Sequence, residues 1–127
     1  MLRQGSGVVI NVASVNGPVA QAGRTAYFLA KGAGVIRLTE VLVSEWASHR
    51  VRVNAVAPSV FPTDLVVAAL NAGAASLDGY VDRTPARRLG DLEVLADVFL
   101  YLASDQSSYV TGQTLRVDGG WVSGHYL

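Results

Sequence analysis

Cysteine is absent from this 127-residue sequence, and ten Lys and Arg residues balance ten Asp and Glu residues. Without cysteine there is no disulfide, no thiolate nucleophile and no cysteine-based zinc site. Without a basic excess there is no electrostatic footprint for nucleic acid or for an anionic membrane surface. We therefore expect no nucleic-acid partner, no membrane partner and no metal site, and the lack of disulfides fits a cytoplasmic protein.

Long hydrophobic runs are also missing, and none approaches the roughly 18 to 20 residues that span a bilayer. The first residues lack the layout of a signal peptide. Half of the residues are hydrophobic, 13 are glycine and only 8% are aromatic. This profile is typical of an α/β protein, and the length predicts a single domain over residues 1–127.

Three short runs rich in β-branched residues predict strands. The run from Gly7 to Val12 is bounded by glycines and predicts a strand buried on both faces. The run from Val51 to Ala57 is stopped by Pro58, which cannot donate a hydrogen bond to a neighbouring strand. The run from Gln113 to Val117 precedes an Asp-Gly-Gly turn.

Segments with apolar residues at helical spacing separate these strands. Thr25 is expected to cap a long helix that continues to about Ser48. The other predicted helices are Asp64 to Asn71, a single turn at Asp78 to Arg83 within the irregular stretch 72–90, and Leu92 to Ala103 with Asp91 as its cap. Strand and helix alternate, so right-handed crossovers make the three strands parallel and place helices on both faces.

We therefore predict an α/β, Rossmann-like doubly wound parallel sheet. A complete domain of this kind opens with a strand and a glycine-rich phosphate turn, but no G-x-G-x-x-G stands in the sequence. The first strand would also expose a long Val/Ile edge if nothing paired with it. Both observations predict a partial domain, the C-terminal half only, which lacks the dinucleotide-binding N-terminal half.

Three side chains are the strongest candidates for chemistry. Lys31 is the only lysine, the other nine basic residues being arginines, and its apolar helical neighbours argue against a solvated surface charge. Tyr27 precedes it by four residues, so the two side chains share a helix face. An ammonium ion near a phenol favours the phenolate and so lets a tyrosine exchange protons near neutral pH. Ser14 follows the first strand, where its hydroxyl can orient a reacting oxygen.

Each of these residues also has an ordinary structural interpretation. A Tyr-x-x-x-Lys pattern occurs by chance in many helices, and Ser14 alone is a plausible turn or cap residue. Lys31 could be a structural lysine whose stem covers apolar surface, or a Schiff-base nucleophile, but the latter leaves Tyr27 and Ser14 unexplained. The isolated remaining candidates are interpreted as surface residues: His49, His125 and the solvated pair Arg87-Arg88.

Several segments, in the same order, resemble the short-chain dehydrogenase/reductase family. One is Asn11-Val12-Ala13-Ser14-Val15-Asn16-Gly17, and another is Tyr27-Phe28-Leu29-Ala30-Lys31, whose tyrosine follows Ser14 by 13 residues. The others are Arg-Val-Asn-Ala-Val-Ala-Pro at 52–58, Thr-Gly-Gln at 111–113 and Val-Asp-Gly-Gly-Trp at 117–121. Within the family the sequence looks closest to gluconate 5-dehydrogenases, with 3-oxoacyl-carrier-protein reductases almost as similar.

The resemblance implies reversible hydride transfer between a secondary alcohol and a ketone, with NAD or NADP as cofactor. Tyr27 would be the general acid/base, Lys31 would hold the nicotinamide ribose and favour the tyrosinate, and Ser14 would position the substrate oxygen. The implied cofactor-binding residues are Tyr27, Lys31, Pro58, Ser59, Val60 and Thr63. Ser59 departs from the family pattern, because a glycine usually follows the loop proline.

The family also implies a homo-oligomer, a dimer or a tetramer, in which the long helix and the last strand pack between subunits. An alternative function therefore stays open. The chain could be a truncated, non-catalytic fragment that acts only as an oligomerising or interaction module. The stretch from Phe61 to Gly90, which would shape the substrate pocket, has too little pattern to name the alcohol or ketone.

Overall fold

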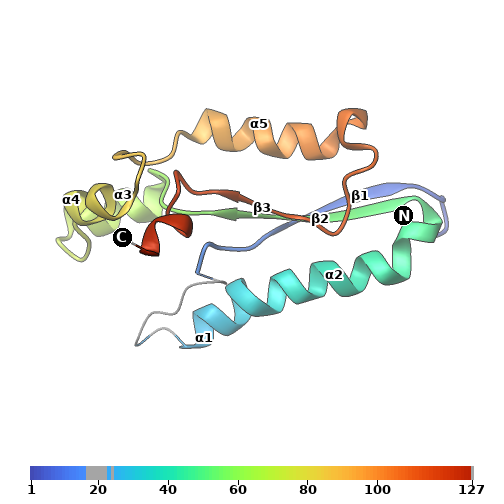
Figure 1. The fold of residues 1–127 in the computed structure, drawn as a ribbon, viewed down its shortest axis with the longest axis horizontal. Helices are drawn as coiled ribbons and strands as arrows, with labels where there is room; N and C mark the ends of the chain where they lie inside the picture. Colours follow the sequence, from blue (N-terminus) through green and yellow to red (C-terminus); the bar gives the residue numbers. More distant parts are fainter. Residues whose placement is uncertain (17–22, 24, 127) are drawn as a thin grey trace.

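A three-stranded parallel sheet forms the centre of the computed structural model, which describes residues 1–16, 23 and 25–126. The strands lie in the order β1 (Gly7–Val12), β2 (Val51–Pro58), β3 (Thr114–Val117), so each one pairs with its neighbour in sequence (Figure 1). Gly7 lies opposite Val51, and Ala55 lies opposite Thr114. The predicted strands and their parallel arrangement are confirmed, with β2 extended by one residue to include Pro58 and β3 beginning one residue later, at Thr114.

Helices cover both faces of this sheet, as predicted. A long helix, made of α1 (Thr25–Tyr27), a π-helical segment (Phe28–Gly34) and α2 (Val35–Trp46), lies against one face. It ends in a 3-10 turn at Ala47–His49, and α5 (Leu92–Ala103) lies against the opposite face (Figure 1). Two shorter helices, α3 (Asp64–Asn71) and α4 (Leu77–Arg83), lie together beyond the end of β2.

The helix ends agree closely with the prediction. Asp91 caps α5, its Oδ1 accepting a hydrogen bond of 2.9 Å from the Glu93 amide. The single turn expected near Asp78 is a full helix, α4, which Ser76 caps by accepting from the Gly79 amide. Thr25 is the first helical residue rather than the cap before the helix, a difference of one position. None of the described helices is long and apolar enough to cross a membrane.

The core lies around β2, whose residues Val51, Val53, Ala55, Val56 and Ala57 are almost completely buried. By contrast β1 is only half-buried, and Val12 is 48% exposed. The prediction of a strand buried on both faces is therefore wrong for β1. Among the described residues β1 pairs with β2 alone, so its other edge and the side chains beside it stay open.

Asn54 ties the buried strand β2 to the segment that leads into β3. The side chain is 0% exposed. Its Nδ2 donates to the Val110 carbonyl at 2.8 Å, and its Oδ1 accepts from the Gln113 amide at 3.0 Å. One amide side chain thus satisfies two backbone groups of the segment that leads into β3.

We predict that Asn54→Ala lowers the free energy of unfolding by about 2 to 4 kcal/mol. The substitution removes both hydrogen bonds of a fully buried side chain and leaves a cavity in its place, and the loss of a buried hydrogen-bonding partner costs roughly 1 to 3 kcal/mol. Urea denaturation followed by circular dichroism measures this change. Asn71→Ala, at an exposed position at the end of α3, is the matched control and should change stability little; equal effects would contradict the assignment.

Candidate functional site

The candidate site lies where the three parallel strands end. Ser14 follows β1, Ser59 follows β2 and Asp118 follows β3, and the carboxyl ends of parallel strands form the usual binding edge of an α/β sheet. Backbone hydrogen bonds hold these ends together. The Val15 amide donates to the Pro58 carbonyl at 3.2 Å, and the Ser59 amide donates to the Val117 carbonyl at 3.1 Å.

Ser14 is 5% exposed. Its Oγ accepts a hydrogen bond of 3.2 Å from the Asn16 amide, which is the turn role that its position after a strand also allowed. A serine hydroxyl can accept and donate at the same time. Within the described residues the Ser14 proton has no acceptor, so this group remains available to an oxygen atom placed at the strand end.

Tyr27 and Lys31 lie on successive turns of the long helix. Tyr27 is 46% exposed and meets Phe28 edge to face, with 6.4 Å between the ring centroids. The Lys31 Nζ donates to the Val12 carbonyl at 3.4 Å, at the last residue of β1 and two residues before Ser14. This contact brings the ammonium group to the strand end that carries Ser14. Among the described residues no hydrogen bond joins the three side chains to one another.

Lys31 is nevertheless exposed. The expectation that its apolar neighbours would keep it from solvent is wrong for this structure. Ala30, Ala33 and Gly34 beside it are exposed as well, and only Gly32 is buried. The apolar composition of the segment reflects small residues on an open face of the helix rather than a buried environment.

A polar contact that the sequence analysis missed holds the long helix against β1. Thr39 is 0% exposed, and its Oγ1 accepts from the Asn11 Nδ2 at 2.9 Å. The same hydroxyl donates to the Val35 carbonyl, also at 2.9 Å. The one available signal was a threonine within the apolar face of a predicted helix, and nothing in the sequence pointed to Asn11 as its partner.

The predicted cofactor loop, residues 58–63, continues from β2 along the same edge. The Val60 carbonyl accepts from the Gly90 amide at 3.0 Å, which joins the loop to the start of α5. A side chain at Gly90 would collide with the buried Phe61, since an added Cβ would lie 2.2 Å from its ring. Thr63 stands exposed at the start of α3 without a capping hydrogen bond from its side chain.

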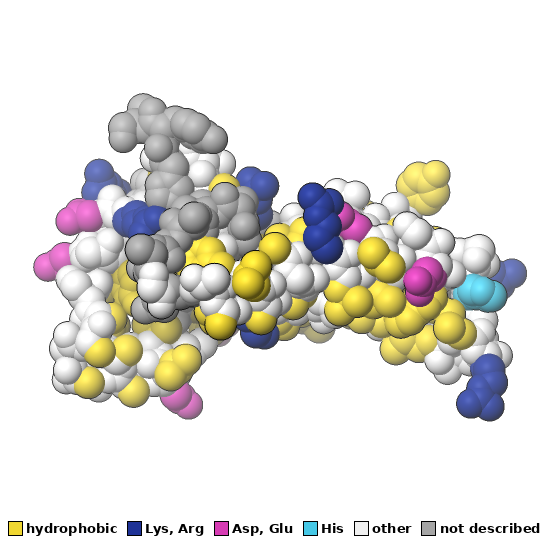
Figure 2. Space-filling view, turned by 90° about the horizontal axis from the view of Figure 1, so that it is seen from below, with side chains coloured by type: hydrophobic (Ala, Val, Ile, Leu, Met, Phe, Trp, Pro, Cys, Tyr) yellow, Lys and Arg dark blue, Asp and Glu magenta, His cyan; other side chains and the backbone are white. Residues whose placement is uncertain are grey.

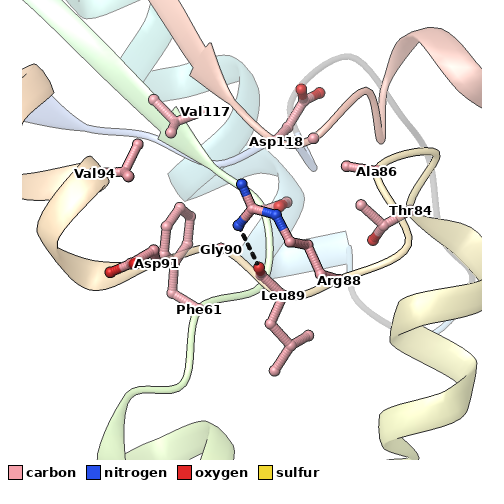
Figure 3. A pocket seen from close by; sticks show the side chains of 12 residues that line it. Phe61, Thr84, Ala86, Arg88, Leu89, Gly90, Asp91, Val94, Val117 and Asp118 are labelled. Carbon is pink, nitrogen blue, oxygen red and sulfur yellow. Dashed lines mark hydrogen bonds between the residues drawn. The ribbon is translucent and has the colours of Figure 1, made fainter.

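A separate cavity of about 130 Å³ lies between this loop, the start of α5 and the end of β3 (Figure 3). Of the predicted cofactor residues, Ser59 lines it, but Ser14, Tyr27 and Lys31 do not. The Arg88 guanidinium extends into the cavity and donates to the Leu89 carbonyl at 3.1 Å. Asp91 and Asp118 also line it, and their carboxylates accept hydrogen bonds from the backbone amides of Glu93, Gly120 and Val122.

The weaker candidates behave as surface residues where the structure describes them. His49 is exposed at the end of the long helix, and Arg87 pairs with Asp82 at 3.1 Å between exposed side chains. The side chain of His125 and residue Gly17 of the Ser14 segment are outside the described part. Within that part no three His, Asp or Glu side chains come together as a metal site.

Comparison with known proteins identifies the family. Residues 1–122 match the family model described as enoyl-(acyl carrier protein) reductase. The chain is 42% identical over 120 residues to nodulation protein G of Azospirillum brasilense, covering 94% of this chain and 47% of that protein. It is 41% identical over 122 residues to the 3-oxoacyl-[acyl-carrier-protein] reductase FabG of Thermotoga maritima, covering 96% and 48%.

Solved structures agree. The chain superposes on a gluconate 5-dehydrogenase from Burkholderia cenocepacia, solved with NADP and tartrate, with a TM-score of 0.88 and 36% identity. That match covers 96% of this chain and 47% of the other. The protein belongs to the short-chain dehydrogenase/reductase family, and its sheet is part of a Rossmann-type fold. The chain spans about half the length of the relatives that it matches.

We predict that Thr39→Val lowers the free energy of unfolding by about 1 to 3 kcal/mol, although valine has nearly the same shape. The change removes the hydroxyl that accepts from the Asn11 amide, and it leaves this part-buried amide without its acceptor beside the fully buried position 39. Thr39→Ser keeps the hydroxyl and is the matched control. Thermal and urea unfolding should rank Thr39→Ser above Thr39→Val in stability; the reverse order would show that the Asn11 contact contributes little.

Proposed function

We propose that this chain carries the catalytic half of an NAD(P)-dependent oxidoreductase that interconverts a secondary alcohol and a ketone. The observation that carries the proposal is the contact of the sole lysine with the end of β1, which brings an ammonium group beside the strand end that bears Ser14. The family assignment supports it, as does a structural relative solved with NADP.

The residues of this edge fit the nicotinamide end of such a cofactor. An ammonium group has three hydrogen-bond donors. Lys31 uses one of them to bind the Val12 carbonyl, so two remain for the ribose hydroxyls. In the loop, the Val60 amide and the Thr63 hydroxyl make no hydrogen bond among the described residues. These two groups, one a donor and the other both donor and acceptor, suit a carboxamide. A bound nicotinamide supplies or accepts the hydride.

The chain's own side chains would handle the proton and the substrate oxygen. Tyr27 Oη, on a half-exposed side chain, gives its proton to the developing alkoxide during reduction and takes it back during oxidation. The Ser14 hydroxyl, whose proton is unused in the described structure, donates to the same oxygen and holds it in place. Lys31, whose ammonium group lies at the end of β1, would hold the nicotinamide ribose.

An interaction role is the second candidate, and the open edge of β1 favours it. Unpaired backbone groups on an edge strand accept a further strand. The outer face of the long helix also exposes Leu29, Leu38 and Val41, and hydrophobic side chains follow this face in the space-filling view (Figure 2). The two candidates are compatible, because a partner strand at β1 and a partner surface on the outer face of the helix would leave the strand ends that carry the candidate site free.

The Tyr27 proposal predicts that Tyr27→Phe lowers turnover at least about 100-fold, the usual contribution of a general acid/base, while cofactor affinity changes little. Turnover is followed by the absorbance of the reduced nicotinamide, with a panel of polyols, sugar acids and β-keto thioesters as substrates. Tyr109→Phe, at a fully exposed tyrosine, is the control. Equal activity of the Tyr27 and Tyr109 variants would refute the acid/base role.

The Lys31 proposal predicts that Lys31→Met weakens binding of NADH or NADPH by about 10- to 100-fold. Hydrogen bonds to a charged group contribute about 1.5 to 3 kcal/mol each, and a factor of ten corresponds to about 1.4 kcal/mol. Nicotinamide fluorescence measures the affinity. Arg37→Met, on the exposed side of the same helix where Arg37 pairs with Glu40, removes the same charge elsewhere and should leave affinity unchanged. If both variants lose cofactor affinity to the same extent, the loss comes from the change in net charge and the Lys31 proposal is wrong.

A further inference from the structure

The helix that carries Tyr27 and Lys31 changes its winding in its middle. Residues Phe28–Gly34 form a π-helix, and α-helix resumes at Val35. Its hydrogen bonds run from one residue to the fifth before it, so each turn holds one more residue than an α-helical turn. Lys31 lies at the centre of this segment, and Tyr27 immediately precedes it.

The π-helical segment changes which residues share a face. Thr39 comes twelve residues after Tyr27. In an uninterrupted α-helix, at about 100° per residue, Thr39 would lie about 120° around the axis from Tyr27. A π-helical segment that takes up one extra residue reduces the total rotation by about 100°, the rotation of one residue. The angle between Tyr27 and Thr39 around the helix axis is then roughly 20°. Tyr27 and Thr39 therefore point to nearly the same side of the helix.

Contacts with β1 at two places agree with this geometry. Thr39 is buried and binds Asn11, and the Lys31 ammonium binds the carbonyl of the next residue, Val12. The helix is therefore held to β1 at Thr39, which binds Asn11, and the Lys31 side chain, two turns earlier in the helix, reaches the end of the same strand. Without the extra residue in the wide turn, anchoring Thr39 at Asn11 would rotate Tyr27 away from that end.

Gly34 is the residue that permits the wide turn. An added Cβ at this position would lie 2.7 Å from the Leu29 carbonyl oxygen, which is backbone and cannot move aside as a flexible side chain can. In α4 the helical Gly79 has ordinary space, since an added Cβ would lie 3.4 Å from the Ser76 Cβ. Gly34 is thus held by its surroundings in a way that Gly79 is not.

We propose that the π-helical segment absorbs one residue of the helix so that Tyr27 and Lys31 keep register with the Asn11–Thr39 anchor, and that Gly34 is the positioning residue for this register. The catalytic meaning of the register rests on the function proposed above. The register itself is a property of the fold and is measured without cofactor or substrate.

The experiment follows the contact of Lys31 with Val12 in the 127-residue chain by NMR. Because Lys31 is the only lysine, ¹³C-lysine labelling gives the signals of one side chain, and cross-peaks from its ε-methylene to Val12 report the contact. Gly34→Ala should lose these cross-peaks, whereas Gly79→Ala should retain them. Deletion of Gly34 should also retain them, because eleven residues of continuous α-helix again leave Tyr27 and Thr39 about 20° apart.

The deletion variant decides the matter if Gly34→Ala does not fold. A folded deletion variant that keeps the Lys31–Val12 cross-peaks upholds the proposal. Loss of the cross-peaks in the deletion variant, its failure to fold, or their retention at parental strength in Gly34→Ala overturns it. Absence of turnover or of cofactor binding in the parent chain would count against the proposed function, and it would leave these cross-peaks and their interpretation untouched.

Discussion

The hydrogen bond between the half-buried Asn11 amide and the fully buried Thr39 hydroxyl fixes the long helix against β1, and the candidate site depends on this attachment. Asn11 lies one residue before the end of β1, and Thr39 is fully buried. Because Thr39 is fully buried and Asn11 is partly buried, separating them would leave a buried hydroxyl without its donor and a part-buried amide without its acceptor. The attachment therefore fixes the position of the helix along β1 and its rotation about its own axis. These two in turn fix where Tyr27 and Lys31 lie relative to Ser14.

The sheet explains why one part of the candidate site is buried and another part is exposed. β2 is buried and its end is joined by backbone hydrogen bonds to the residues after β1 and to the last residue of β3. Ser14 is held on that rigid edge, whereas the Lys31 and Tyr27 side chains are exposed next to the open strand β1. The matched relatives are about twice as long as this chain.

The sequence was enough to predict the three strands, their parallel pairing and the helices on both faces. Those features follow from local periodicity and from crossover handedness. Motif spacing also led correctly to the family. The burial of β1 could not be predicted, because it depends on what lies beside the strand rather than on its own Val and Ile residues. The predicted roles of Ser14, Tyr27, Lys31 and the loop residues remain predictions.

Two features of the site lay beyond sequence reasoning for a physical reason. The Asn11–Thr39 contact joins residues 28 positions apart, and no local pattern encodes such a pair. The π-helical segment has a faint signal, two glycines inside a helix at Gly32 and Gly34, since glycine is a poor helix former. Composition alone cannot distinguish a wide turn from a weak α-helical turn, because the difference is one of hydrogen-bond partners.

The central claim is that the strand end bearing Ser14, together with Lys31 and the loop after β2, binds the nicotinamide end of the cofactor. Titration of the ¹⁵N-labelled and ¹³C-lysine-labelled chain with NADPH and NADH, followed by chemical-shift changes, tests this claim most directly. The account predicts saturable changes at the Val60 amide and the Lys31 side chain. Changes confined to the cavity at Arg88 and Asp118, or no saturable change at millimolar cofactor, would contradict it.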